Sequence, residues 1–275
     1  MTRATDKPAT PSAGDTPGGR SEMPALRTYD DLDALSRAAA DELVAIARAA
    51  VEARGTCAIA LSGGSTPKRL FQLLAARGRD ALPWDRIELW WSDERCVPPD
   101  QADSNYRMAR EALIDPLRLD PARVHRMHGE DADRERAARD YERLLVAALG
   151  TPPVVDYMML GMGPDGHTAS LFPHSPGLDE RQRWVIANRI ASDTVRLTMT
   201  VPTILAARAI RVLTAGAEKA GALHAVLEGP YDAHQYPSQL IAERATWFVD
   251  RAAAAQLRGR IHAGALAADV SGGDS

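Results

Sequence analysis

An acid and a histidine stand on either side of a glycine in the middle of the chain, as Asp165-Gly166-His167. The apolar run at residues 157–160 comes before them and is typical of a buried strand. Imidazole titrates near neutral pH, so a histidine in a glycine-rich loop after a strand is suited to proton transfer. The same residues also fit a loop in which Asp165 only holds His167 in place.

The glycines around this pair match another pattern, since Gly161, Gly163 and Gly166 satisfy the dinucleotide-binding spacing G-x-G-x-x-G. That site requires a helix directly after the glycines and an acidic residue about 20 positions further on. Here Pro164 interrupts the glycines, and a second proline follows at Pro173. The sequence therefore argues against a dinucleotide site, and a loop histidine without a catalytic role remains the alternative.

A second candidate site follows the apolar strand predicted at residues 57–61, where the chain reads S-G-G-S-T-P. Thr66 can cap a helix and Pro67 suits a first helical turn, so a helix is expected to begin here. Free N–H groups and the helix dipole favour a phosphate at such an end. The G-K-[ST] ending of a P-loop and the G-x-S-x-G of a nucleophile elbow are both missing. We favour a phosphate site, with a turn that binds nothing as the alternative.

Charged residues follow further predicted strands. Asp93, Glu94 and Arg95 come directly after the strand at residues 86–91, and ligands of parallel sheets bind at the carboxyl ends of the strands. A solvated loop is the alternative for these three residues. Lys219 falls in the first turn of a later helix, where a lysine opposes the helix dipole unless it reaches an anion. A surface lysine is the alternative there.

Strands and helices alternate along the chain, and this predicts a doubly wound α/β fold with a mostly parallel sheet and helices on both faces. Besides those at 57–61, 86–91 and 157–160, strands are predicted at 124–127, 184–187, 195–200, 210–215 and 246–249. Helices are predicted at about 30–54, from 66, at 104–115, 131–149, 202–208 and 216–229, at 237–241 as a short helix or turn, and after Asp250. The predicted capping residues are Asp30 or Asp31, Ser104 and Asp250.

The two ends of the chain differ in composition from the rest. Residues 1–24 are rich in Thr, Pro, Ser, Gly and Asp without apolar periodicity, so we expect a disordered N-terminal tail. Residues 263–275 are expected to form a disordered C-terminal tail. No internal repeat or linker divides the intervening sequence, so residues 25–262 are predicted to form a single α/β domain.

Bulk composition excludes several classes of protein. The net charge of −4 gives no basic footprint for nucleic acid, and no apolar run is long enough to span a membrane. No secretory signal is visible at the N-terminus. Cys57 and Cys96 are too few for a disulfide framework, so a cytoplasmic protein with reduced cysteines is expected. His125 and His128 are too isolated to indicate a metal site, and neither a metal nor a cofactor is predicted.

Taken together, the motifs resemble the 6-phosphogluconolactonase family over residues 26–257. The matching segments are L-S-G-G-S-T-P (61–67), W-W-S-D-E-R-C-V-P (90–98), S-N-Y-R-M (104–108), G-M-G-P-D-G-H-T-A-S-L-F-P (161–173), R-L-T-M-T (196–200) and G-A-E-K-A (216–220). The resemblance implies a fold of the NagB/RpiA type. It also implies hydrolysis of 6-phospho-D-glucono-1,5-lactone to 6-phospho-D-gluconate, a step of the oxidative pentose phosphate pathway, without a metal or cofactor.

The resemblance also implies roles for individual residues. His167 would be the general base on a water, and Asp165 would fix its tautomer or orient the water. Arg95 would stabilise the oxyanion or hold the phosphate, and both roles stay open. The residues expected to bind the substrate and its phosphate are Ser62, Gly63, Gly64, Ser65, Thr66, Asp93, Gly163, Arg196 and Lys219.

Two relatives give alternatives. Glucosamine-6-phosphate deaminases resemble the chain but read D-G-H-x-x-x-x-E-P, and Phe172 stands where their glutamate assists ring opening. They usually carry a tyrosine where this chain has Arg95. Non-catalytic sugar-phosphate sensors usually carry a helix-turn-helix segment, for which the Pro/Gly-rich residues before the first helix are unsuited. We therefore expect a sugar-phosphate lactone as the ligand, no nucleic-acid or membrane partner, and a monomer or small homo-oligomer.

Overall fold

The computed structural model describes residues 24–258, so the predicted C-terminal tail and all but the last residue of the N-terminal tail lie outside the described residues. The strands are β1 (Ala25–Tyr29), β2 (Cys57–Leu61), β3 (Ile87–Trp91), β4 (Asp93–Arg95), β5 (Tyr157–Gly161), β6 (Val185–Ala191), β7 (Thr194–Met199), β8 (Ala209–Thr214) and β9 (Ala245–Asp250). The α-helices are α1 (Leu32–Arg54), α2 (Ser65–Ala76), α3 (Asn105–Ala109), α4 (Asp115–Leu117), α5 (Arg134–Leu149), α6 (Val201–Ala206) and α7 (Ala220–Leu227). Within the described residues, none of these helices is long and apolar enough to cross a membrane.

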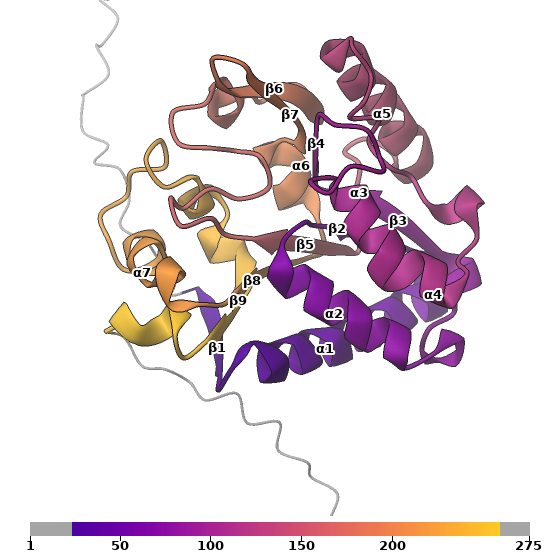
Figure 1. Cartoon of the computed structure of the whole chain (residues 1–275), viewed down its shortest axis with the longest axis horizontal. Helices are drawn as coiled ribbons and strands as arrows, with labels where there is room; N and C mark the ends of the chain where they lie inside the picture. The colour runs from indigo at the N-terminus through magenta and orange to yellow at the C-terminus, as the bar shows by residue number, and fades with distance from the viewer. Residues whose placement is uncertain (1–23, 259–275) are drawn as a thin grey trace, which may run out of the picture.

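Six strands form one sheet in the order β1-β9-β8-β5-β2-β3, and every neighbouring pair is parallel. The parallel sheet predicted from the sequence is therefore confirmed (Figure 1). The chain passes from β2 outward to β3, returns across β2 to β5, and then continues in the other direction to β8 and β9. The strand order thus reverses between β2 and β5, and loops that follow such neighbours form a crevice in which ligands bind.

Three strands lie outside this sheet, in a smaller antiparallel sheet of order β4-β7-β6. The strands predicted at 184–187 and 195–200 exist as β6 and β7, but only Ser192-Asp193 separates them, and so short a connection can only join antiparallel strands. Asp93 and Glu94 are buried in β4. The solvated-loop alternative for these residues is wrong, because pairing with β7 carries them into the interior.

Two edge features differ from the sequence-based expectations. β1 was not predicted, and it forms an edge of the large sheet by pairing with β9. Its Tyr29 ring stacks on Phe248 with centroids 5.7 Å apart, so its register depends on a partner late in the chain. The strand predicted at 124–127 is reduced to one bridge between Val124 and Leu89.

Helices pack on both faces of the sheet, as two consecutive tryptophans in β3 demonstrate. The Trp91 ring meets Tyr106 of α3 at 5.6 Å, and the Trp90 ring meets Tyr141 of α5 at 5.9 Å. Since successive side chains of a strand point to opposite faces, α3 and α5 cover opposite faces. The Tyr141 hydroxyl also accepts a hydrogen bond from the Trp91 N–H at 2.8 Å, which covers the open edge of the sheet.

The capping predictions are mostly confirmed. The Asp31 side chain accepts from the Ala34 N–H at 2.8 Å at the start of α1, and Gly55 ends that helix with φ 78°. Ser104 caps α3, but the helix predicted after Asp250 is only the 3-10 segment Ala253–Gln256, whose N-cap residue is Ala252; Asp250 accepts the Ala253 N–H at 2.7 Å. Thr66 is not a cap: α2 begins at Ser65 after Gly64, and no side chain caps it.

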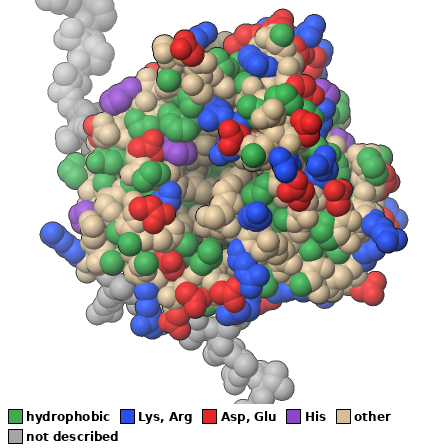
Figure 2. Space-filling model, viewed as in Figure 1, with side chains coloured by type: hydrophobic (Ala, Val, Ile, Leu, Met, Phe, Trp, Pro, Cys, Tyr) green, Lys and Arg blue, Asp and Glu red, His purple; other side chains and the backbone are tan. Residues whose placement is uncertain are grey.

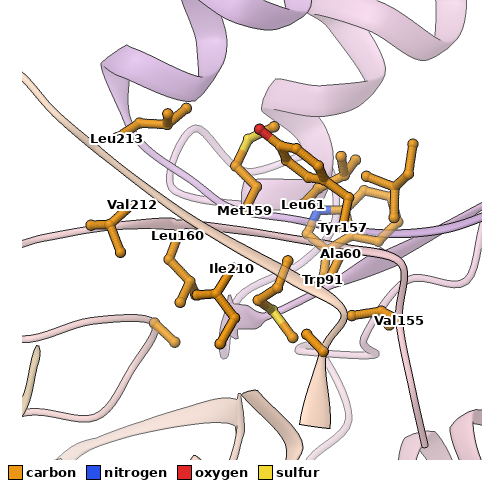
Figure 3. Close-up of a cluster of buried hydrophobic side chains, with 14 of the residues drawn as sticks. Ala60, Leu61, Trp91, Val155, Tyr157, Met159, Leu160, Ile210, Val212 and Leu213 are labelled. Carbon is orange, nitrogen blue, oxygen red and sulfur yellow. The ribbon is translucent and has the colours of Figure 1, made fainter. Parts of the chain in front are cut away.

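The centre of the sheet is a continuous apolar core, to which β2, β3, β5 and β8 contribute Leu61, Trp91, Tyr157, Leu160 and Ile210 (Figure 3). All five side chains are at most 1% exposed. Strands buried on both faces need apolar residues throughout, which explains the unbroken hydrophobic runs in the sequence. This packing fixes the strand ends from which the site loops extend.

Candidate active site

A cavity of about 230 Å³ lies at the carboxyl ends of β2 and β5, where the strand order reverses. Five segments line it: the loops after β2 and β5, strand β4, the first residue of α3 and the segment before α7. The lining residues are Ser62, Gly63, Gly64, Asp93, Arg95, Asn105, Gly161, Met162, Gly163, Pro164, His167, Ala169 and Lys219. The structure therefore brings candidate residues of four separate sequence segments to one place, with Asn105 of α3 beside them.

The acid–histidine pair forms a dyad at this cavity. Asp165 Oδ1 lies 2.6 Å from Nδ1 of His167 and also accepts the His167 backbone N–H at 3.2 Å. Burial raises the pKa of the Asp165 carboxyl, but its hydrogen bond to His167 and the charge of that residue outweigh burial, and the net pKa is lowered. An ionised carboxylate accepts only, so Nδ1 donates to it, and in the neutral imidazole Nε2 then carries the lone pair. The His167 side chain is 25% exposed and lines the cavity.

Glycine is required at Gly163 because a Cβ there would overlap the His167 ring and the Asp165 carboxylate. The loop closes through hydrogen bonds from the Gly163 N–H to the His167 carbonyl at 2.9 Å and from the Gly166 N–H to the Gly163 carbonyl at 3.0 Å. A bridge between Thr168 and Leu171 follows where a dinucleotide site would need a helix. The dinucleotide interpretation is thereby excluded.

The ring of Phe172 stacks on the His167 imidazole, with centroids 4.0 Å apart and planes 21° apart. One face of the imidazole is thus covered by an apolar ring, which holds its plane together with the Asp165 hydrogen bond. Phe172 offers no carboxylate at this position, so His167 is the group here that can move a proton.

The loop after β2 forms the opposite wall with Ser62, Gly63 and Gly64. The helix α2 that follows has no side-chain cap, so its first N–H groups remain available to an anion. Ser65 and Thr66 belong to this first turn but do not line the cavity.

Lys219 reaches the same cavity, and it forms no ion pair within residues 24–258. It occupies the N-cap position of α7. A cation at this position opposes the helix dipole, so an anion in the cavity is its natural partner.

Two arginines lie side by side in the small sheet, because Arg95 of β4 is the register partner of Arg196 in β7. Burial lowers the pKa of the Arg196 guanidinium, and the neighbouring charge of Arg95 lowers it further. Neither arginine has a carboxylate partner in the part of the chain that the structure describes. Arg95 donates to the Asp103 carbonyl at 2.6 Å and lines the cavity, whereas Arg196, its partner on β7, does not line it.

The two acidic residues of β4, Asp93 and Glu94, make different contacts. Asp93 lines the cavity, and its carboxylate accepts from the Ser170 hydroxyl at 2.7 Å. Glu94 points away from it and accepts the N–H groups of Asn105 and Tyr106, both at 2.8 Å. Burial raises the pKa of Glu94, and these backbone hydrogen bonds oppose that rise. Glu94 therefore anchors α3 to β4.

Asn105 is the polar lining residue that sequence reasoning missed, besides the apolar Met162, Pro164 and Ala169. It lies within the matching segment S-N-Y-R-M, next to the helix cap Ser104, and that position beside a cap was the available signal. Its side chain donates from Nδ2 to the Asp93 carbonyl at 3.0 Å.

Other titratable side chains of the described residues, among them His125 and Cys57, lie outside the cavity lining. Among residues 24–258, no group of three or more His, Cys, Asp and Glu side chains is placed to hold a metal ion. His125 is held by Glu88 at 2.6 Å and stacks on Trp90 at 4.1 Å. Cys57 and Cys96 are free thiols, and burial raises the pKa of Cys57 to about 12.

Comparison with known proteins gives consistent matches. The family described as glucosamine-6-phosphate isomerases/6-phosphogluconolactonase matches residues 30–249. A 6-phosphogluconolactonase of Synechocystis is 42% identical over 216 residues, which cover 76% of this chain and 88% of that protein. One of Streptomyces coelicolor is 38% identical over 251 residues, which cover 86% of this chain and 96% of that protein.

Solved structures agree with these relatives. The 6-phosphogluconolactonase from Trypanosoma cruzi is 29% identical with a TM-score of 0.76, over 86% of this chain and 97% of that one. A monomeric glucosamine-6-phosphate deaminase is 23% identical with a TM-score of 0.72, over 84% of this chain and 99% of that one. At this identity the likeness to the deaminase concerns the fold alone.

Proposed function

This chain belongs to the family of glucosamine-6-phosphate isomerases and 6-phosphogluconolactonases, and from that premise we propose which residues carry its reaction. Its activity is that of a 6-phosphogluconolactonase, a hydrolase of the pentose phosphate pathway. The substrate is 6-phospho-D-glucono-1,5-lactone and the product is 6-phospho-D-gluconate. The observation that supports the residue roles is the 2.6 Å contact between Asp165 and Nδ1 of His167. His167 lines a cavity that the positively charged side chains of Arg95 and Lys219 also line.

His167 acts as the general base in this proposal. Its Nε2 accepts a proton from a water as the water oxygen attacks the C1 carbonyl of the lactone. Asp165 holds the tautomer in which Nε2 is the acceptor, and its negative charge stabilises the imidazolium that forms. When the bond between C1 and the ring oxygen breaks, the imidazolium returns the proton to that oxygen, so the base is regenerated.

The start of α2 and the side chains of Lys219 and Arg95 bind the charged parts of the substrate. The phosphate binds at the first turn of α2, beside Gly63 and Gly64, where uncapped N–H groups and the helix dipole favour an anion. Lys219 adds a positive charge from the start of α7. Arg95, which lines the cavity, contacts either the phosphate or the developing oxyanion, and Arg196 beside it on β7 raises the local positive potential.

The decisive measurement is the rate of lactone opening with the spontaneous rate in water subtracted. His167→Ala is expected to lower kcat by about 100- to 10,000-fold, which is the usual contribution of a general base. Binding of 6-phosphogluconate is expected to remain within about 3-fold, because the phosphate contacts lie on the other wall.

His234→Ala provides the matched control, since His234 is an exposed histidine whose side chain is 57% accessible. It should keep the wild-type rate. Full turnover by His167→Ala would move the base to another residue. If the wild type does not accelerate opening, ammonia release from glucosamine 6-phosphate is the next assay, because Phe172 then fails as the reason for excluding a deaminase.

Localisation and assembly belong to the same proposal. Free Cys57 and Cys96 support a reducing, cytoplasmic compartment. Acidic and basic side chains are interspersed on the face shown in Figure 2, a pattern that supports a small-molecule ligand over nucleic acid. The assembly that we propose is a monomer or a small homo-oligomer. Light scattering of the purified protein measures the assembly.

A further inference from the structure

The Asn105 side chain lies in the wall of the cavity and is only 2% exposed. It is the first residue of α3, and its backbone N–H is held by Glu94 at 2.8 Å. The orientation of its amide is fixed by chemistry. Nδ2 lies 3.0 Å from the Asp93 backbone carbonyl, and because a carbonyl only accepts, the amide nitrogen must face it.

The amide oxygen therefore points the other way, toward the loop after β2. A Cβ built on Gly63 would overlap Oδ1 of Asn105, so this oxygen lies directly over the Gly63 backbone. No donor within residues 24–258 makes a hydrogen bond to it. Oδ1 is not among the fully buried polar atoms that lack a partner, and its residue lines the cavity, so a ligand that supplies a donor there gains a hydrogen bond.

The chemistry of this acceptor restricts what it can bind. A phosphate dianion has only acceptor oxygens and would repel Oδ1, so the phosphate cannot be its partner. The neighbouring Asp93 carboxylate is a second acceptor in the same wall. Two acceptors side by side, in a cavity that Arg95 and Lys219 also line, suit a molecule that carries both hydroxyl groups and an anion.

We propose that Asn105 is a specificity-determining residue, whose Oδ1 accepts a hydrogen bond from one ring hydroxyl of the lactone. This inference rests on the proposed lactonase function and adds to it the group that selects a polyhydroxylated ring. The Nδ2 contact to β4 and the close approach to Gly63 hold Oδ1 in place between the acidic strand and the phosphate loop.

The test compares the parent lactone with its three monodeoxy analogues, which lack the hydroxyl at C2, C3 or C4. For one analogue, wild-type kcat/KM is expected to fall by about 10- to 100-fold, as for the loss of a hydrogen bond that leaves a buried acceptor unpaired. In Asn105→Ala the parent lactone should lose a similar factor, and the same analogue should then lose less than about 3-fold more.

Asn188→Ala is the matched control, because Asn188 is an equally buried asparagine, 1% exposed, that lies outside the cavity lining. Its amide is fully used by Ser170, Ser175 and Gly177. This variant should be less stable yet discriminate among the analogues as the wild type does. Asn105→Ser is a second variant in case the alanine variant does not fold, since its hydroxyl can donate to Asp93 while Oδ1 is still removed.

The outcomes distinguish a failure of the role proposed for Asn105 from a failure of the lactonase function. Equal discrimination in the wild type and in both Asn105 variants overturns the inference and leaves the lactonase function intact. No discrimination by the wild type overturns it as well, and so does the loss of discrimination in Asn188→Ala. A wild type that does not open the parent lactone removes the proposed function, and this inference with it.

Discussion

The loops after β2 and β5 begin at neighbouring strand ends, and both are rich in glycine, yet they present different chemical groups to the cavity. The loop after β2 leads at once into α2 and presents mainly backbone, with Gly63 and Gly64 at the cavity. The loop after β5 leads into no helix and presents side chains, with His167 at the cavity and Asp165 hydrogen-bonded to its Nδ1. One loop offers the partial charges of a helix end, and the other offers a group that changes its protonation.

This difference explains why a glycine pattern alone predicts so little. In the loop after β2, glycine lets the chain turn into the helix, and Gly64 has φ 102°. In the loop after β5, Gly163 leaves room for an imidazole and a carboxylate to meet. In the proposed mechanism the same residue type therefore supports binding in one loop and proton transfer in the other, and substitutions at the two glycines should have distinct kinetic signatures.

The largest effect is expected from Gly163→Ala. The added Cβ would overlap Nδ1 and Cε1 of His167, so the dyad must shift or separate. We expect kcat to fall by about 100- to 10,000-fold, as for the loss of the base itself, with KM within about 3-fold. Steady-state kinetics of lactone opening measure both constants.

Gly161→Ala is the control from the same loop, since the nearest atom to its added Cβ is the Leu213 carbonyl oxygen at 3.9 Å. It should cost far less, roughly 3-fold or below, because such a contact is of ordinary van der Waals length. Similar losses in the two variants would show that the loop tolerates no alanine at all, and the argument from the dyad would fail.

A smaller effect of another kind is expected from Gly63→Ala. Here the added Cβ would overlap the Asn105 amide and push it from the wall of the cavity. Overpacking of this kind typically costs 1–3 kcal/mol, and we expect KM to rise by roughly 10- to 100-fold with a smaller change in kcat.

A sharper test is to introduce Gly63→Ala into the Asn105→Ala variant. In Asn105→Ala the overlapping amide is absent, so adding Gly63→Ala should cost less than about 3-fold more. Equal losses in the two backgrounds would mean that the alanine disturbs the phosphate loop directly, without acting through Asn105.

The sequence predicted those features that depend on local chemistry. The apolar runs of β2 and β5 and the caps at Asp31 and Ser104 needed only their neighbours, and the structure confirms them. The meeting of the loops after β2 and β5 also followed, because parallel strands bring their carboxyl ends to one edge.

What could not be predicted depends on partners far along the chain. β4 is a strand only because β7, about a hundred positions later, pairs with it, and alone its D-E-R sequence resembles a solvated loop. Asn105 reaches the cavity because Glu94 binds the start of α3 and Gly63 leaves space for its amide. Neither the pairing of β4 with β7 nor the contacts of Asn105 produce a periodic pattern in the sequence, so no local pattern could reveal them.

The smallest effect among these predictions concerns the lysine that faces the phosphate loop. Lys219 lines the cavity, whereas Lys68 in the first turn of α2 is exposed and points away from it. If the wall formed by α2 binds the phosphate, Lys219→Met should raise KM by about 10-fold, in line with the loss of one charge-assisted hydrogen bond. The KM of the wild type should rise with salt, and that of the variant should rise less steeply. Lys68→Met should leave both KM and its salt dependence unchanged, because its charge is screened by solvent. If Lys219→Met lowered kcat alone, the lysine would belong with His167 among the groups that act on the reacting carbonyl, and the division between a binding wall and a reacting wall would have to be redrawn.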